Sequence, residues 1–244
     1  MILEICAGSI ESVIAARNGG AQRVELCSAL SEGGLTPSVG LMRAARRVEG
    51  LKMHVLIRPR SGDFLYSREE IAIMKDDIRA AHDCGADGVV IGALNPCGTI
   101  DTDACAEMIA AAEEMSITFH RAFDMVSDAD KALSEIIALG CHRILTSGLQ
   151  PTAEEGIPML RHLVEKAAGR IIIMPASGVS PQNARKIISM TGANEIHASA
   201  RSEKRSGMTY RNSDVTMGAK DADEFARMET DETIVKTIIS NLSL

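Results

Sequence analysis

The feature that most constrains the fold of this chain is an alternation of short apolar runs with longer stretches of helical periodicity, which recurs about eight times in 244 residues. The apolar runs predict strands at 2–6, 22–27, 53–58, 87–92, 116–120, 142–146, 171–175 and 194–199. The other stretches predict helices at 10–18, 38–48, 68–84, 102–114, 128–139, 158–167, 181–190 and 231–242. Such alternation calls for a parallel sheet, and strands about 30 residues apart match the repeat of an eightfold β/α barrel.

A weak internal repeat favours a closed barrel over an open sheet. A glycine followed by Ala or Cys precedes the second, fourth, sixth and eighth predicted strands, at Gly20, Gly85, Gly140 and Gly192. A barrel built from two-unit quarters produces this rhythm, whereas an open doubly wound sheet has no reason to. Because no linker divides the chain, we expect residues 1–244 to form one domain. The predicted fold class is α/β, a single (β/α)8 TIM barrel with a long polar loop over 200–230 and a C-terminal helix.

Composition and charge exclude several kinds of function. Aromatic residues make up only 2% of the chain and the net charge is −7, whereas nucleic-acid binding needs a basic face and exposed rings. No apolar run approaches the roughly 20 residues that span a bilayer, and the first residues lack a signal-peptide pattern. The six cysteines form no Cys-x-x-Cys pair, so neither a zinc finger nor a disulfide framework is expected. We expect a cytoplasmic protein that binds no nucleic acid, membrane or nucleotide cofactor.

The alternation within each strand predicts which side chains face the barrel axis. In a parallel barrel, apolar residues that face the helices alternate with residues that face inward. This parity points ionisable side chains toward the strand ends where barrel enzymes carry their chemistry, and the candidate catalytic residues are Glu4, Glu25, Arg58, His120 and His197. On neighbouring strands, the Glu4 and Glu25 carboxylates could share one site and hold a proton for acid–base catalysis. The alternative is a buried Glu25–Arg58 ion pair.

Two cysteines, Cys6 and Cys27, follow the same parity and are expected one layer above the two carboxylates. Thiolates select soft metals, so a Cu(I) ion between the two sulfurs is one interpretation. Inert packing of two buried cysteines and a disulfide between neighbouring strands are the others. The spacing of the residues does not decide among the three.

Small residues and arginines near the later strand ends favour an anion. The small residues expose backbone N–H groups, and Ser180-Pro181 predicts a helix N-terminus that attracts negative charge. The candidate anion-binding residues are Arg60, Arg121, Ser147, Gly148, Ser177, Gly178, Ser199 and Arg201. The alternative is a set of tight turns, with the arginines paired to Glu25, Asp63 and Asp124. A small anionic or phosphorylated molecule is the ligand that these residues favour.

Several motifs together resemble those of one family. The chain is similar to the CutC family, known as copper homeostasis proteins, in RVELCSALSEGGLTPS (23–38), IRPRSGDFLYS (57–67), TFHRAFD (118–124), LTSG (145–148), ASGV (176–179), EIHASA (195–200) and MTYRN (208–212). The resemblance covers most of the chain and implies a (β/α)8 barrel, a cytoplasmic location and a role in copper handling. It also implies that Cys6 and Cys27 are the metal ligands and bind Cu(I).

Two main functions remain open at this point. The resemblance implies a copper homeostasis protein with Cu(I) at the barrel mouth. The inward polar residues favour a barrel enzyme, such as an isomerase or lyase, that transfers protons on a small anionic or phosphorylated substrate, and a sensor without chemistry is a third interpretation. The residues assign no reaction. In either case we expect a homo-oligomer, a dimer or a tetramer, whose ligand is a copper ion or a small anion.

Overall fold

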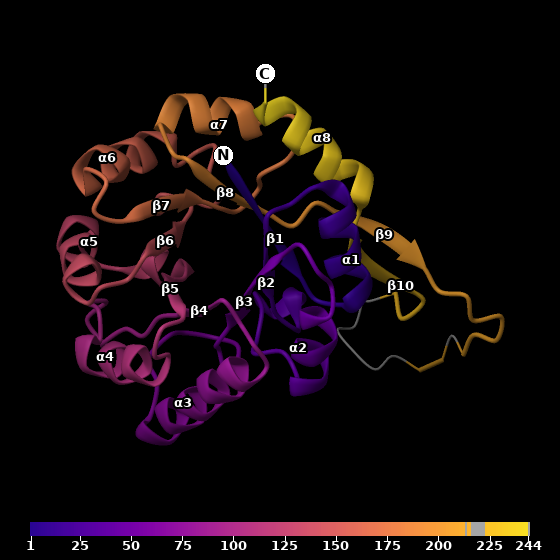
Figure 1. Ribbon diagram of the computed structural model, residues 1–244, viewed down its shortest axis with the longest axis horizontal. Coiled ribbons are helices and arrows are strands. Elements are labelled where there is room, and N and C mark those ends of the chain that lie inside the picture. Colours follow the sequence, from indigo (N-terminus) through magenta and orange to yellow (C-terminus); the bar gives the residue numbers. More distant parts are fainter. Residues whose placement is uncertain (213, 216–222, 244) are drawn as a thin grey trace.

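A ring of eight parallel strands forms the centre of the computed structural model, which describes residues 1–212, 214–215 and 223–243 (Figure 1). The strands are β1 (Ile2–Ala7), β2 (Arg23–Leu26), β3 (Lys52–Leu56), β4 (Gly88–Ile91), β5 (Ser116–Phe119), β6 (Arg143–Thr146), β7 (Ile172–Pro175) and β8 (Glu195–Ala198). They pair in the order β7-β6-β5-β4-β3-β2-β1-β8, and the two end strands, β7 and β8, lie side by side. The strands therefore form a nearly closed barrel, which confirms the predicted fold class.

Helices surround this barrel on the outside (Figure 1). They are α1 (Ile10–Gly19), α2 (Val39–Arg46), α3 (Arg68–Asp83), α4 (Thr102–Ala111), α5 (Ala129–Ala138), α6 (Ile157–Ala167), α7 (Ala184–Thr191) and α8 (Glu232–Leu242), with short 3₁₀ helices η1 (Leu30–Glu32) and η2 (Arg121–Met125) after β2 and β5. The outward side chains of the strands, such as Leu3, Ile5 and Val24, are buried in the core between the two rings. The parity predicted from the sequence therefore describes the strands correctly.

Two features of the fold differ from the sequence-based expectation. Helix α7 begins at Ala184 rather than at Pro181, because the Asn183 Oδ1 accepts the Ser180 N–H at 2.8 Å and holds these residues in a turn. The stretch 200–230 was expected to be a loop throughout, but it contains two antiparallel strands, β9 (Arg201–Arg205) and β10 (Ala226–Thr230). Part of the remainder of this stretch lies outside the described residues.

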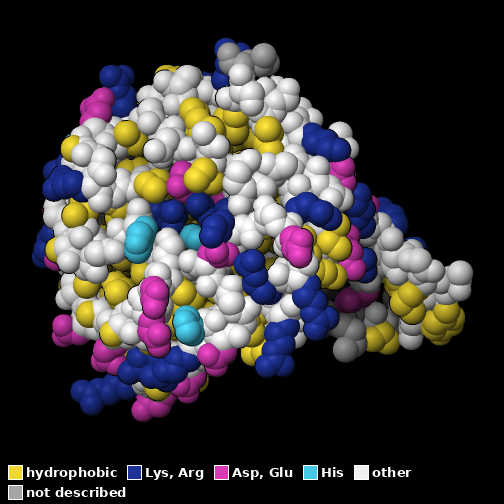
Figure 2. Space-filling view, viewed as in Figure 1, with side chains coloured by type: hydrophobic (Ala, Val, Ile, Leu, Met, Phe, Trp, Pro, Cys, Tyr) yellow, Lys and Arg dark blue, Asp and Glu magenta, His cyan; other side chains and the backbone are white. Residues whose placement is uncertain are grey.

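The surface carries charged side chains of both signs. On the face that Figure 2 shows, Lys and Arg side chains lie interspersed with Asp and Glu side chains around the barrel. Several Lys and Arg side chains gather below and to the right of the barrel mouth on this face. Within the described ranges, every helix is too short or too polar to cross a bilayer.

Glycines in and after β4 make room for two imidazole rings inside the barrel. A Cβ atom added at Gly88 would lie 2.6 Å from the Ser116 carbonyl oxygen and 2.7 Å from the His54 Nε2. A Cβ atom added at Gly92 would lie 2.6 Å from the His120 ring. Both rings therefore pack directly against the backbone of this part of the chain.

We expect Gly88→Ala to destabilise the protein by about 1–3 kcal/mol, because the new methyl group meets a backbone oxygen that cannot move aside. The measurement is the urea midpoint of unfolding at an unchanged m value. Gly207→Ala is the matched control, since a Cβ atom there meets nothing within 4 Å and should change stability by less than about 0.5 kcal/mol. Equal midpoints for both variants would contradict this account of β4.

Candidate functional site

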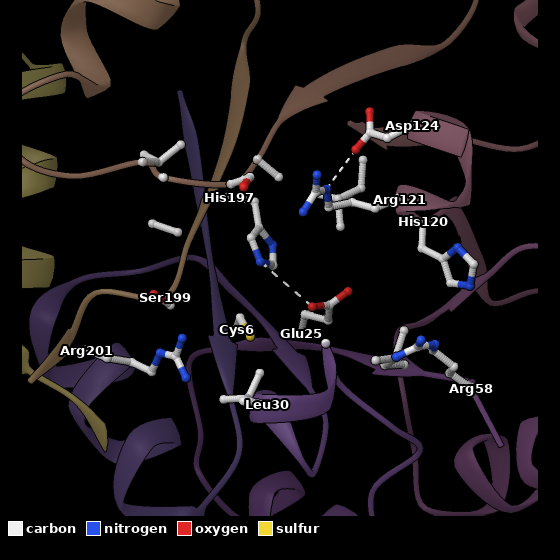
Figure 3. A pocket seen from close by; sticks show the side chains of 18 of the residues that line it. Cys6, Glu25, Leu30, Arg58, His120, Arg121, Asp124, His197, Ser199 and Arg201 are labelled. Atoms are coloured by element: carbon white, nitrogen blue, oxygen red, sulfur yellow. Dashed lines mark hydrogen bonds and ion pairs between the residues drawn. The ribbon is translucent and has the colours of Figure 1, made fainter. Parts of the chain in front are cut away.

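The cavity at the barrel mouth has a volume of about 490 Å³ and is lined by residues at and beyond the C-terminal ends of the strands. Four of the candidate catalytic residues, Glu25, Arg58, His120 and His197, line it, and Glu4 lies below them. Figure 3 shows the side chains of Glu25, Arg58, His120 and His197 around one space. Most of the predicted catalytic residues therefore share one cavity.

A layer of buried charges lies beneath the cavity. The Arg23 guanidinium donates hydrogen bonds to both Glu4 and Glu195, and the Arg143 Nε donates to the same Glu195 oxygen at 3.1 Å. All four side chains are less than 10% exposed. A buried charge is tolerated where it is paired in this way. Arg143 was not among the residues singled out from the sequence. The alternation of side chains along β6, with Ile144 facing the helices, could have placed Arg143 inward.

The register of the strands corrects the expected pairing of the carboxylates. Glu4 lies opposite Arg23 on β2 and opposite His197 on β8, while Cys6 lies opposite Glu25. The expectation that Glu4 and Glu25 lie in one layer is therefore wrong by one inward step, because Glu25 is level with Cys6. The reason is the stagger between neighbouring strands that closing a barrel requires, which the parity of single strands does not contain. The expected neighbourhood of Cys6 and Cys27 is present, with their sulfur atoms 3.8 Å apart.

The two carboxylates differ in their protonation. Burial raises the pKa of Glu4, but a hydrogen bond with His197 and the positive charge of Arg23 outweigh it and leave this pKa well below its usual range. Burial also raises the pKa of Glu25, and the adjacent His197 opposes the shift only in part, so that the pKa reaches about 7. Glu4 is thus a fixed negative charge, and Glu25 is the carboxylate that can gain or lose a proton near neutral pH.

His197 connects the charge layer to the cavity. Its Nδ1 lies 2.8 Å from the Glu4 Oε1, and its Nε2 lies 3.8 Å from the Glu25 Oε2 (Figure 3). Burial lowers the pKa of His197, but hydrogen bonds with Cys6 and Glu4 and the charge of Glu25 raise it well above the ordinary value. The ring is therefore held as a cation between two carboxyl groups.

Cys6 and Cys27 meet beside this imidazole. Their sulfur atoms are 3.8 Å apart, and both cysteines are free, so the structure contains no disulfide between them. Cys6 lines the cavity, whereas Cys27 is fully buried beside Leu56 and Val90 and its thiol donates to the Ala7 carbonyl at 3.6 Å. The hydrogen bond with Cys27 and burial raise the pKa of Cys6 well above its ordinary value. A metal ion at this thiol must therefore displace a proton.

Arg58 shapes the mouth instead of pairing with Glu25. Its guanidinium donates to the backbone carbonyls of Glu32 at 2.8 Å, Gly34 at 2.9 Å and Gly62 at 2.8 Å. The alternative of a buried Glu25–Arg58 ion pair is therefore wrong. Arg58 ties the loop after β2 to the loop after β3, and this contact positions the wall of the cavity.

His120 is a neutral imidazole at the opposite wall. Its Nδ1 accepts a hydrogen bond from the Ala122 N–H at 3.2 Å, so the ring proton lies on Nε2. Burial and the nearby charge of Arg58 lower the pKa of His120 to about 3. The Nε2 atom has no hydrogen-bond partner, and neither has the Nε of Arg58.

The candidate anion-binding residues are only partly brought together. Those that line the cavity are Arg121, Ser177, Gly178, Ser199 and Arg201, whereas Arg60, Ser147 and Gly148 lie outside its wall. Two of the arginines are engaged with carboxylates: Arg121 pairs with Asp124 at 2.7 Å, and Arg60 with Asp63 at 3.2 Å. Pairing with Asp63 and with Asp124 is what the alternative interpretation, tight turns without an anion, predicts for these arginines. The Ser177 hydroxyl likewise donates to the Pro151 carbonyl, at 2.8 Å.

We expect His120 to make the protein less stable in mild acid. Because its pKa of about 3 in the folded state lies below the unfolded value of about 6.5, the unfolded chain binds the proton first. The contribution of this group to stability is complete above pH 6.5 and is lost as the pH falls toward 3. His120→Asn should therefore remove about 2 kcal/mol of the stability lost between pH 7 and pH 5.

The measurement is chemical denaturation of both proteins at several pH values. Asparagine keeps an acceptor for the Ala122 N–H, and His162→Asn changes an exposed histidine as the matched control. Parallel pH profiles of the His120 variant and the unmodified protein would show that His120 is not buried in its neutral form.

The comparisons with known proteins identify the family. The sequence model of the CutC family matches residues 1–202. The chain is 48% identical over 238 residues to a human protein named copper homeostasis protein cutC homolog, covering 97% of this chain and 87% of that protein. It is 49% identical over 238 residues to a CutC family protein of Bacteroides thetaiotaomicron, covering 96% of each.

Solved structures agree with this result. A crystal structure described as copper homeostasis protein CutC from Streptococcus agalactiae has a TM-score of 0.79 and 35% identity, covering 82% of this chain and 98% of that chain. A thiamine phosphate pyrophosphorylase from Pyrococcus furiosus, at 18% identity and a TM-score of 0.60, covers 99% of this chain and 95% of its own, and shares the fold alone. The resemblance that the sequence motifs indicate is confirmed, and the chain belongs to the CutC family.

Proposed function

We propose that this protein acts in copper homeostasis in the cytoplasm and binds Cu(I) between Cys6 and Cys27 at the barrel mouth. The observation that carries the proposal is the 3.8 Å separation of the two sulfur atoms. Thiolate ligands select Cu(I), and the cytoplasm keeps free thiols reduced. Relatives with nearly half of their residues identical are named for copper homeostasis.

The geometry of the two sulfurs suits one ion bound by both. With a metal–sulfur bond of about 2.3 Å, sulfurs 3.8 Å apart subtend an angle of roughly 110° at the ion. That angle belongs to a trigonal or tetrahedral site rather than to a linear one. The two thiols therefore act as a chelate and leave the side of the ion toward the cavity open.

The surroundings of the two thiols give them different parts in binding. Cys6 lines the cavity and can meet an incoming ion, whereas Cys27 lies behind it among apolar side chains. Leu56 and Val90 keep water from the Cys27 sulfur, which protects a soft thiolate–copper bond from hard competing ligands. Copper is in this view the cargo of the protein, taken up at Cys6 and retained by both sulfurs.

Replacing either ligand should weaken Cu(I) binding by about 100-fold or more, since loss of a direct ligand exceeds the 10–100-fold effect of an outer partner. The variants are Cys6→Ser and Cys27→Ser, and the measurement is anaerobic competition with a Cu(I) chelator of known affinity. Cys105→Ser is the matched control for a buried thiol and Cys97→Ser for an exposed one.

Circular dichroism and thermal unfolding confirm that each variant is folded, and Cys27→Ala replaces Cys27→Ser if the hydroxyl is not tolerated in its apolar surroundings. Undiminished Cu(I) binding in the double variant of Cys6 and Cys27 would remove this site from consideration. Loss of binding in the Cys97 variant alone would place the copper on the surface instead.

A further inference from the structure

A sulfur, a carboxylate and an imidazole converge at one point of the cavity. Cys6, Glu25 and His197 come from β1, β2 and β8, which are neighbours in the barrel. One ligand atom of each lies within 4.8 Å of the other two, and all three residues are buried and line the cavity (Figure 3). In the described part of the chain, no other three His, Cys, Asp or Glu residues meet in this way.

The imidazole of this group is already oriented as a metal ligand. The Nδ1 of His197 lies 2.8 Å from the Glu4 Oε1, and Glu4 is itself held by Arg23. Histidines that bind metals in proteins donate their other ring N–H to a carboxylate, which fixes the tautomer and leaves the remaining nitrogen free to bind. Here the remaining nitrogen is Nε2, which faces Glu25. Because the ring is a cation in the metal-free protein, a metal ion must displace a proton from this nitrogen, as it must at Cys6.

The separation of the nitrogen and oxygen ligand atoms is close to what a small divalent ion needs. Zinc bonds of about 2.0–2.1 Å to nitrogen and oxygen and about 2.3 Å to sulfur place tetrahedral ligand atoms roughly 3.3–3.6 Å apart. The His197 Nε2 and the Glu25 Oε2 are 3.8 Å apart, which is too long for a hydrogen bond but close to this range. A thiolate and a carboxylate also balance the charge of a divalent cation.

We infer that Cys6, Glu25 and His197 form a site for Zn²⁺ or a similar borderline divalent cation, with a fourth position open to the cavity. The mixed donor set separates this ion from Cu(I), which takes the two thiolates. Three protein ligands with an open position are typical of zinc sites that bind a water or a substrate, whereas structural zinc sites are closed by four. Ser199 and Arg201 line the same cavity as polar neighbours of this group.

This inference goes beyond the proposed copper function and does not rest on it. The two sites share Cys6, but Cys27 serves only the copper site and Glu25 serves only the divalent site. One variant of each residue therefore separates the two proposals. Glu25→Gln keeps the size of the side chain and removes its charge, and Cys27→Ser removes the second sulfur.

The experiment titrates the metal-free protein with Zn²⁺ by calorimetry and with Co²⁺ by absorption spectroscopy. We expect one equivalent of Zn²⁺ per chain and a thiolate-to-cobalt charge-transfer band. Glu25→Gln should weaken Zn²⁺ binding by about 100-fold or more, whereas Cys27→Ser should bind Zn²⁺ as the unmodified protein does. Cys6→Ser should abolish the charge-transfer band. The same variants are titrated with Cu(I), where the effects of Glu25→Gln and Cys27→Ser should be reversed.

Three results would overturn the inference: no Zn²⁺ binding by the unmodified protein, a Co²⁺ complex without a thiolate band, or zinc affinity that depends on Cys27 and not on Glu25. The first two use the unmodified chain and are decisive even if a variant fails to fold. Zinc binding without Cu(I) binding would leave this site standing and refute the copper proposal. Cu(I) binding without zinc binding would do the opposite.

Discussion

The interaction on which the rest of this site depends is the pairing of the Arg23 guanidinium with Glu4 and Glu195 inside the barrel. These side chains are buried, and an unpaired charge there would be strongly unfavourable. Arg23 satisfies two carboxylates at once, and Arg143 supports the second of them. Removing one member of such a set typically costs about 3–5 kcal/mol, because its partners stay buried and uncompensated. This layer of Arg23, Arg143 and the two carboxylates therefore stabilises the barrel interior. Its members are not expected to change charge during function.

The protonation states of the ionisable residues at the barrel mouth follow from this layer of buried charges. Because Arg23 and His197 keep Glu4 ionised, Glu4 can hold the His197 ring by its Nδ1. The ring then faces Glu25 and Cys6 with its other nitrogen. Of the two carboxylates that the sequence offers for acid–base work, only Glu25 has a pKa near neutrality, about 7. Catalysis by these residues stays a prediction, but the structure divides them into one fixed charge and one adjustable group.

Much of this arrangement could be predicted from the sequence, and the rest could not for definite reasons. The two-residue period of a strand points Glu4, Cys6, Glu25 and His197 inward without knowledge of any neighbour. Their relative positions along the barrel axis depend on how far neighbouring strands are staggered. The sequence of a single strand gives no information on this stagger. The partner of Arg58 was missed for a related reason: backbone carbonyls bind it, and a sequence gives no sign of which carbonyls a loop will present.

Cys6 then determines how the two proposed metals relate to each other. It contributes a sulfur to the pair with Cys27 and also to the group with Glu25 and His197. One thiolate at this position serves one site at a time, so a soft cation and a borderline cation would compete even though their other ligands differ. A Cu(I) ion would use the Cys6 sulfur together with that of Cys27, which lies among apolar side chains, whereas a divalent ion would use it together with Glu25 and His197. Which ion is bound thus depends on which ligands the Cys6 sulfur joins: that of Cys27 for Cu(I), or those of Glu25 and His197 for the divalent ion.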